Sequence, residues 1–118
     1  MILDEQKEFF KNFTEMQANI LLKKGDDYAN DDRLSNFKLG GNIVQLTGEQ
    51  QCLSLIATKV ARLGVLLSNG KTPKNESIED NIIDLANYSF LLYCLFKEMD
   101  LQRMKQIGKE LNSCFDYK

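Results

Sequence analysis

The apolar positions of this chain recur every three or four residues, the spacing that places side chains on one face of an α-helix. A first helix is predicted from about Asp4 to Lys24. Its apolar stripe consists of Phe9, Phe13, Met16 and Ile20. We expect the helix to stop at Gly25, because Lys23 and Lys24 oppose the negative helix end and glycine can take the left-handed capping conformation.

The next segment, Asp26 to Thr47, is the least regular part and is predicted to be a loop with a short helix. Thr47 and Gln50 then form a capping-box pattern at the start of a second long helix. This helix should end at Ser68-Asn69-Gly70 and pack antiparallel to the next one. Its apolar positions are Leu53, Ile56, Val60, Leu63 and Leu67.

A third helix is predicted from near Ser77 to about Met99, after a polar turn. Its core candidates are Ile78, Ile82, Leu85, Leu92 and Phe96. Asp100 is the expected N-cap of a fourth, shorter helix, and the tail from Ser113 onward is expected to fray. No segment alternates as a strand does, so the prediction is a single all-α domain over residues 1–118, a small bundle of four to five helices.

Composition narrows the range of possible functions. The net charge of -2 argues against a broad nucleic-acid surface, although a free nucleotide needs only one or two local cations. No apolar run approaches the ~20 residues of a membrane span, so we expect no membrane contact and a cytoplasmic location. Three cysteines without a CxxC pair fit reduced thiols, and the absence of histidine leaves carboxylates as metal ligands and general bases.

The most unusual pattern is on the third predicted helix, where Asp80, Asp84 and Asn87 share one face. Two carboxylates one turn apart, with an amide nearby, offer the hard oxygen ligands that suit Mg²⁺. Capping of the helix start is the alternative interpretation of Asp80, and a structural ion pair is the alternative for Asp84.

Lys59 and Arg62 lie one turn apart on the second long helix, where they could approach those acids. Arginine and lysine are the usual partners of phosphate oxygens. A salt-bridge cluster with Asp80 and Asp84, or snorkelling at a helix edge, is an equally open interpretation.

The irregular segment combines hydrogen-bonding groups with aromatic rings, as a base or sugar pocket requires. The candidates are Lys24, Asp27, Tyr28, Asn30, Arg33, Asn36 and Phe37, and Tyr28 and Asn36 are the strongest of them. Ordinary turn formation is the alternative. Phe9, Phe10 and Phe13 are expected to be core or dimer contacts.

These motifs resemble the first of the nucleotide modification associated domain families, small phage and bacterial proteins considered related to MazG-type all-α pyrophosphatases. The similar segments are Lys24-Gly25-Asp26-Asp27-Tyr28-Ala29-Asn30, Asn36-Phe37, Lys59 with Arg62-Leu63, Glu76-Ser77-Ile78-Glu79-Asp80, and Asp84-Leu85-Ala86-Asn87-Tyr88. The resemblance spans about residues 20 to 97. It implies a dimeric or larger bundle that handles canonical or modified nucleotides, with Mg²⁺ on the carboxylates of the third helix.

The chain departs from the pyrophosphatase pattern at two places. The second long helix offers Lys59 and Arg62 where the family has glutamates, and Asn87 replaces an acid. A site poor in metal ligands can still bind a triphosphate while lacking the groups that activate a water.

Three hypotheses follow. The first is a Mg²⁺-dependent pyrophosphohydrolase whose candidate metal-binding and catalytic residues are Glu76, Asp80 and Asp84. Asp80 and Asp84 hold the metal, Glu76 is a candidate ligand or base, and Lys59 and Arg62 steady the phosphates. In this hypothesis Lys24, Asp27, Tyr28, Asn36 and Asn87 complete the nucleotide site. The second is a phage protein that sequesters a nucleotide signal of host defence, and the third is a structural or protein-binding bundle.

Overall fold

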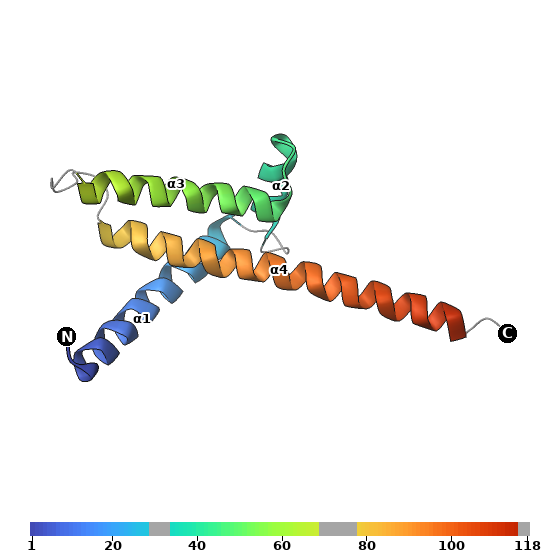
Figure 1. Ribbon diagram of the computed structural model, residues 1–118, viewed down its shortest axis with the longest axis horizontal. Coiled ribbons are helices and arrows are strands. Elements are labelled where there is room, and N and C mark those ends of the chain that lie inside the picture. Colours follow the sequence, from blue (N-terminus) through green and yellow to red (C-terminus); the bar gives the residue numbers. More distant parts are fainter. Residues whose placement is uncertain (29–33, 69–77, 116–118) are drawn as a thin grey trace.

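The computed structural model describes residues 1–28, 34–68 and 78–115, and for residues 24–28, 114 and 115 it describes the backbone alone. The described residues form four helices and no strand: α1 (Leu3–Tyr28), α2 (Ser35–Ile43), α3 (Gly48–Ser68) and α4 (Ile78–Phe115). The predicted all-α class is confirmed. Figure 1 shows α3 and α4 side by side and antiparallel, with α2 at one end of the pair and α1 crossing α4.

The first helix is longer than the sequence predicts, because α1 continues through Gly25 to Tyr28. The expected stop at Gly25 is therefore wrong. A glycine inside a helix costs only about 1 kcal/mol relative to alanine, which is too little to end a helix whose hydrogen bonds continue.

The connection from α2 to α3 follows the predicted chemistry closely. The Thr47 backbone N–H donates to Gln50 Oε1 at 2.9 Å, and the Gln50 N–H donates to Thr47 Oγ1 at 3.1 Å, which confirms the capping box. Just before it, the Leu46 N–H donates to the Gly41 carbonyl at 2.8 Å. A Cβ on Gly41 would lie 2.6 Å from the Leu46 carbonyl oxygen, so the tight turn requires glycine at this position.

The predicted break at Asp100 is also wrong, because α4 runs without interruption over 38 residues. An N-cap requires a non-helical backbone, and neither glycine nor proline lies between Lys97 and Leu101 to interrupt the helix. Asp100 is therefore an ordinary interior position. The expected third and fourth helices are one element.

The core is small and lies where α2, α3 and α4 meet. Its buried apolar side chains are Leu34, Phe37, Cys52 and Leu95. The Phe37 ring meets the edge of Tyr88 with centroids 6.4 Å apart, and the Cys52 thiol donates to the Tyr88 carbonyl at 3.4 Å. An ion pair between Lys38 and Glu98 joins α2 to α4 beside this core.

The single chain is extended rather than compact. Its radius of gyration is 19.3 Å, whereas a compact domain of this length has about 13–14 Å. Several apolar positions that the periodicity assigns to a core are consequently exposed, including Phe9, Leu53, Val60, Ile82 and Phe96. The apolar stripes exist as predicted, but one chain does not cover them.

By length and composition, α3 meets the criteria for a helix that crosses a membrane, with a mean hydropathy of 1.3 and 6% of its apolar window buried. The prediction that no apolar run approaches this length was therefore too strict. The finding is weak evidence for a membrane segment, since core helices of soluble proteins have the same properties. Lys59 and Arg62 also lie within this helix.

Candidate functional site

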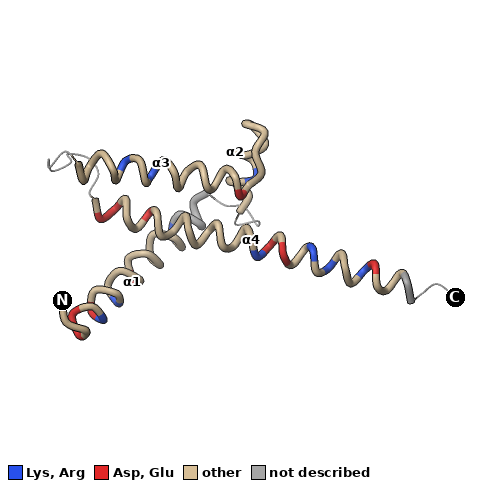
Figure 2. The backbone as a smooth tube through the Cα atoms, in the orientation of Figure 1, with Lys and Arg blue, Asp and Glu red and all other residues tan. Residues whose placement is uncertain are grey.

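The candidate site lies on the facing sides of α3 and α4, where basic residues of α3 lie opposite acidic residues near the start of α4 (Figure 2). Lys59 Nζ is 3.0 Å from Asp84 Oδ2, and the two side chains are only 13% and 21% exposed. The structure thus shows the ion pair that the sequence offered as an alternative.

Asn87 follows Asp84 by three residues on the same face of α4, a rise of about 4.5 Å along the helix. It is 6% exposed. Neither its Nδ2 nor its Oδ1 has a hydrogen-bond partner among the residues that the structure describes. A buried amide without partners costs about 1–3 kcal/mol, and a ligand that accepted from Nδ2 and donated to Oδ1 would remove this cost.

Arg62 and Asp80 extend the charged face by one turn on each helix. Both side chains are exposed, and each has an interaction partner within the chain. Asp80 lies in the first turn of α4, where a carboxylate also opposes the positive helix end. The capping interpretation of Asp80 is therefore compatible with this position, whereas Asp84 lies beyond the first turn.

Among the remaining predicted site residues, Asn36 has a described side chain, and it does not join this face. Asn36 is exposed on α2, which contacts α4 near Glu98. Asp84 precedes Glu98 by almost four helical turns, about 21 Å along the axis. Glu76, Asn30 and Arg33 lie outside the described residues, as do the side chains of Lys24, Asp27 and Tyr28.

The charged face fits a metal ion only when a bound ligand supplies some of the oxygen atoms that coordinate it. Within residues 1–23, 34–68 and 78–113 no three aspartate, glutamate, cysteine or histidine side chains gather into a metal-binding group. Mg²⁺ often uses one or two carboxylates together with substrate phosphates instead of an all-protein cage. Asp80 and Asp84, one turn apart beside Lys59 and Arg62, fit that second mode.

Two features of this region were missed by sequence reasoning. Asn81 is 1% exposed and lies one turn before Asp84, and the only hint in the sequence is an amide next to the apolar pair Ile82-Ile83.

The second feature is the state of two cysteine thiols. Burial raises the pKa of the Cys52 thiol to about 11, and it also raises the pKa of the Cys94 thiol. A thiol with a raised pKa is a poor nucleophile at neutral pH.

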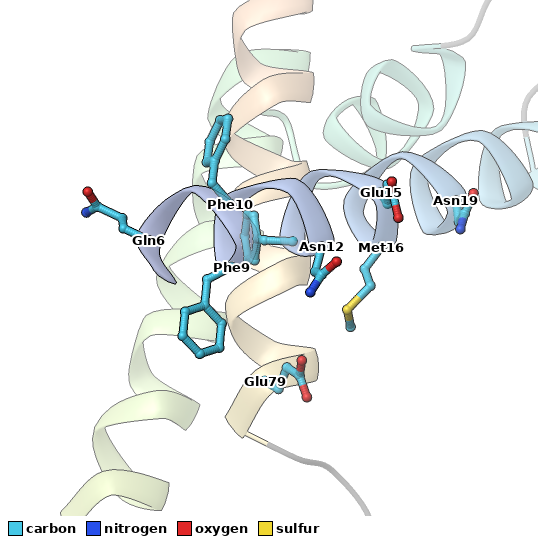
Figure 3. A pocket seen from close by; sticks show the side chains of 9 residues that line it. Gln6, Phe9, Phe10, Asn12, Glu15, Met16, Asn19 and Glu79 are labelled. Carbon is cyan, nitrogen blue, oxygen red and sulfur yellow. The ribbon is translucent and has the colours of Figure 1, made fainter. Parts of the chain in front are cut away.

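A separate open groove with a volume of about 810 Å³ runs along α1, and Figure 3 shows side chains that line it. Phe9, Phe10, Phe13 and Met16 provide its apolar lining, and Glu79 at the start of α4 also lines it. Phe9 and Phe10 are largely exposed, so the prediction that they are core residues of this chain is wrong. Their predicted role as contacts with a second copy remains a prediction.

Comparisons with known proteins add no further information about the site. The chain matches no protein-family model, and comparisons with curated proteins and with solved structures give no match. The resemblance to the nucleotide modification associated domain remains a prediction from the motifs.

Proposed function

We propose that this chain binds a phosphorylated nucleotide, as its Mg²⁺ complex, on the facing sides of α3 and α4. The observation that carries the proposal is the buried amide of Asn87, which has no hydrogen-bond partner among the described residues and lies one turn from the Lys59–Asp84 ion pair. A nucleotide has a charged phosphate chain and an uncharged base and sugar. The face offers one kind of partner for each part.

The phosphate end of the ligand is assigned to the charged residues. Lys59 supplies a point charge and Arg62 a planar fork with several donors, and both suit phosphate oxygens. When the ligand brings Mg²⁺, Asp80 and Asp84 would hold the ion while the lysine turns to phosphate. Mg²⁺ bound there would neutralise phosphate charge and polarise the phosphorus–oxygen bonds.

The base or sugar end is assigned to Asn87. An amide donates through Nδ2 and accepts through Oδ1, which is the pairing that a base edge or a ribose hydroxyl requires. Because the side chain is already buried, it loses little further solvation when the ligand binds. This assignment gives the site its preference for a nucleotide over free pyrophosphate.

Hydrolysis of a nucleoside triphosphate to the monophosphate and pyrophosphate is the proposed reaction. Sequestration of an intact nucleotide is the second candidate, and the Lys59–Asp84 ion pair favours it. Asp84 Oδ2 contacts Lys59 Nζ, so the carboxylate would have to leave the lysine before it could bind a metal ion or accept a proton. Lys59 and Arg62 would bind the phosphates in both functions.

The deciding experiment incubates the purified protein with canonical, modified and cyclic nucleotides and Mg²⁺ or Mn²⁺. Each mixture is analysed by chromatography before and after the protein is denatured. Monophosphate and pyrophosphate that disappear in Asp84→Asn would establish the enzyme. An intact nucleotide that is depleted and then returns on denaturation would establish sequestration, and no change with any nucleotide would refute both.

Matched variants separate local from general effects of charge. The double variant Lys59→Ala, Arg62→Ala should lose nucleotide binding, whereas Lys105→Ala, Lys109→Ala should retain it. Both remove two positive charges, but Lys105 and Lys109 are exposed on the distant half of α4. Equal losses in both variants would show that net charge, not the proposed site, controls binding.

A further inference from the structure

The open groove along α1, which we call the α1 groove, is lined by eight residues of α1 and by Glu79 of α4. Phe9 and Phe10 are 62% and 67% exposed, whereas Phe13 and Met16 are half-buried. Four large apolar side chains on one stretch of helix, two of them largely exposed, are typical of a surface that binds a partner. The α1 groove is therefore a candidate docking surface.

The charges that line the α1 groove have one sign. Glu15 and Glu79 are the charged side chains among its nine lining residues, and its other polar side chains are amides. Lys7 and Lys11 lie on the other side of α1, because at about 100° per residue both are about 160° from Phe9. A partner that complements the groove therefore brings positive charge beside an apolar face.

The shape of the α1 groove indicates an α-helix as its occupant. From Gln6 to Asn19 the lining residues follow about 20 Å of α1, and the groove is open. A small-molecule pocket buries most of its ligand, which an open groove cannot do, whereas an amphipathic helix needs only one buried face. An extended peptide would pair its backbone with a sheet edge, and the described residues contain no strand.

A second copy of this chain fits the α1 groove poorly. On the far half of α4, Asp100 and Arg103 lie within about 40° of Ile107, so their opposite charges cancel beside its apolar stripe. Lys105 and Lys109 are about 160° from Ile107, on the opposite face. The basic residues of α3 belong to the candidate site, and the first two lysines of α1 lie opposite its phenylalanines. We therefore assign the occupant to a different protein.

We propose that the α1 groove binds an amphipathic α-helix of another protein, whose apolar face is bordered by lysine or arginine. The apolar side chains of this helix cover Phe9 and Phe10, and its basic residues face Glu15 and Glu79. Figure 3 shows Phe9 extending from α1 on the side where Glu79 lies, so one helix can reach both kinds of contact. This proposal does not depend on nucleotide binding.

The probe is a synthetic peptide of about 15 residues, which spans about 22 Å as a helix. Its leucines share one helical face, and lysines border that face. Fluorescence anisotropy of the labelled peptide with the full-length protein should give a micromolar Kd, and circular dichroism should show that the bound peptide gains helicity. Three control peptides should not bind: one with glutamate in place of lysine, one with the residue order shuffled, and one with a central proline that prevents a helix.

Variants of the protein locate the bound peptide through its apolar contacts. Phe10→Ala should raise Kd about 5- to 30-fold, the loss typical of an aromatic residue at the centre of an interface. Leu101→Ala removes an exposed apolar side chain from the far half of α4 and should leave Kd unchanged. Both side chains are more than half exposed, so neither change disturbs the core.

A second pair of variants tests the charges. The double variant Glu15→Gln, Glu79→Gln should raise Kd about 2- to 30-fold and weaken the salt dependence of binding. Its matched control, Asp100→Asn with Glu110→Gln, removes the same charge from the far half of α4 and should bind as the wild type does.

A wild type that binds no peptide, or that binds the glutamate or proline peptide equally well, would overturn the proposal. Equal changes of Kd in the groove variants and their controls would do the same. Light scattering without peptide completes the test, because a lower mass in Phe10→Asp than in the wild type would show that a second copy occupies the α1 groove instead. An unchanged mass, together with loss of peptide binding, is the expected result.

Discussion

Replacing Asn87 by leucine should stabilise the protein and abolish its proposed ligand binding at the same time. Asn87 is 6% exposed, and neither atom of its amide has a hydrogen-bond partner among the described residues. Leucine has nearly the same size and no polar atom that must be satisfied. The substitution therefore removes a cost without leaving a large cavity.

The magnitude follows from the desolvation of the amide. A buried polar group without partners costs about 1–3 kcal/mol, and leucine regains that amount while adding apolar burial. The unfolding temperature should rise by about 3–6 °C for each kcal/mol in a domain of this size. Loss of the two hydrogen bonds to a ligand should weaken nucleotide binding by about 5- to 150-fold.

The assay combines urea unfolding with calorimetric titration of nucleotide, at one fixed protein concentration because association shifts apparent stability. Asn87→Asp serves as the matched control. It keeps the shape of asparagine but buries a carboxylate, so it should destabilise the protein at neutral pH and less so at acidic pH.

Destabilisation of the protein by 1 kcal/mol or more in Asn87→Leu would contradict the predicted cost of the buried amide. That result would mean that the amide is satisfied within the folded chain and is a structural residue. Stabilisation without any loss of nucleotide binding would refute its assignment to the ligand site while leaving the energetic argument intact.

Three further predictions concern the fold. Gly41→Ala should destabilise by about 1–3 kcal/mol, because the new Cβ meets backbone oxygen at 2.6 Å, while Gly40→Ala, with its nearest contact at 3.5 Å, should stabilise by up to about 1 kcal/mol in urea unfolding. Thr47→Ala should cost about 1 kcal/mol in the same assay, since it removes the cap of α3, and Thr47→Ser should restore most of that loss. Burial raises the pKa of Cys52 above its ordinary 9.0 to about 11, so its contribution to stability is complete below pH 9 and is lost as pH rises towards 11. The free energy of unfolding should therefore fall by up to about 2–3 kcal/mol between pH 8 and pH 11. Cys52→Ala should lack this fall, and an unchanged fall in that variant would contradict this origin.

The start or end of a helix could be predicted from the sequence where a few neighbouring residues determine it. The capping box at Thr47 and Gln50 and the end of α3 near Ser68 follow from side-chain hydrogen bonding and turn composition alone. The break at Asp100 was mispredicted because an aspartate favours a helix start only where the backbone already turns. Nothing in that stretch of α4 forces such a turn.

The arrangement of the site could be predicted only in part. The spacing of Asp80, Asp84 and Asn87 fixed their shared face, and the approach of Lys59 to Asp84 was one of two interpretations kept open. Burial of Asn87 was not predictable, because it depends on how the helices cross. Separation of Asn36 from the charged face likewise depends on where α2 packs.

The uninterrupted course of α4 has a mechanical consequence. At about 1.5 Å per residue, its 38 residues form a rod of about 57 Å without a hinge. Because every turn is locked to the next by backbone hydrogen bonds, twisting one end of the rod twists the other by nearly the same angle. A neighbour that rotates α4 about its axis at Ile107 therefore also rotates it at Asp84. This rotation turns the charged face towards or away from α3.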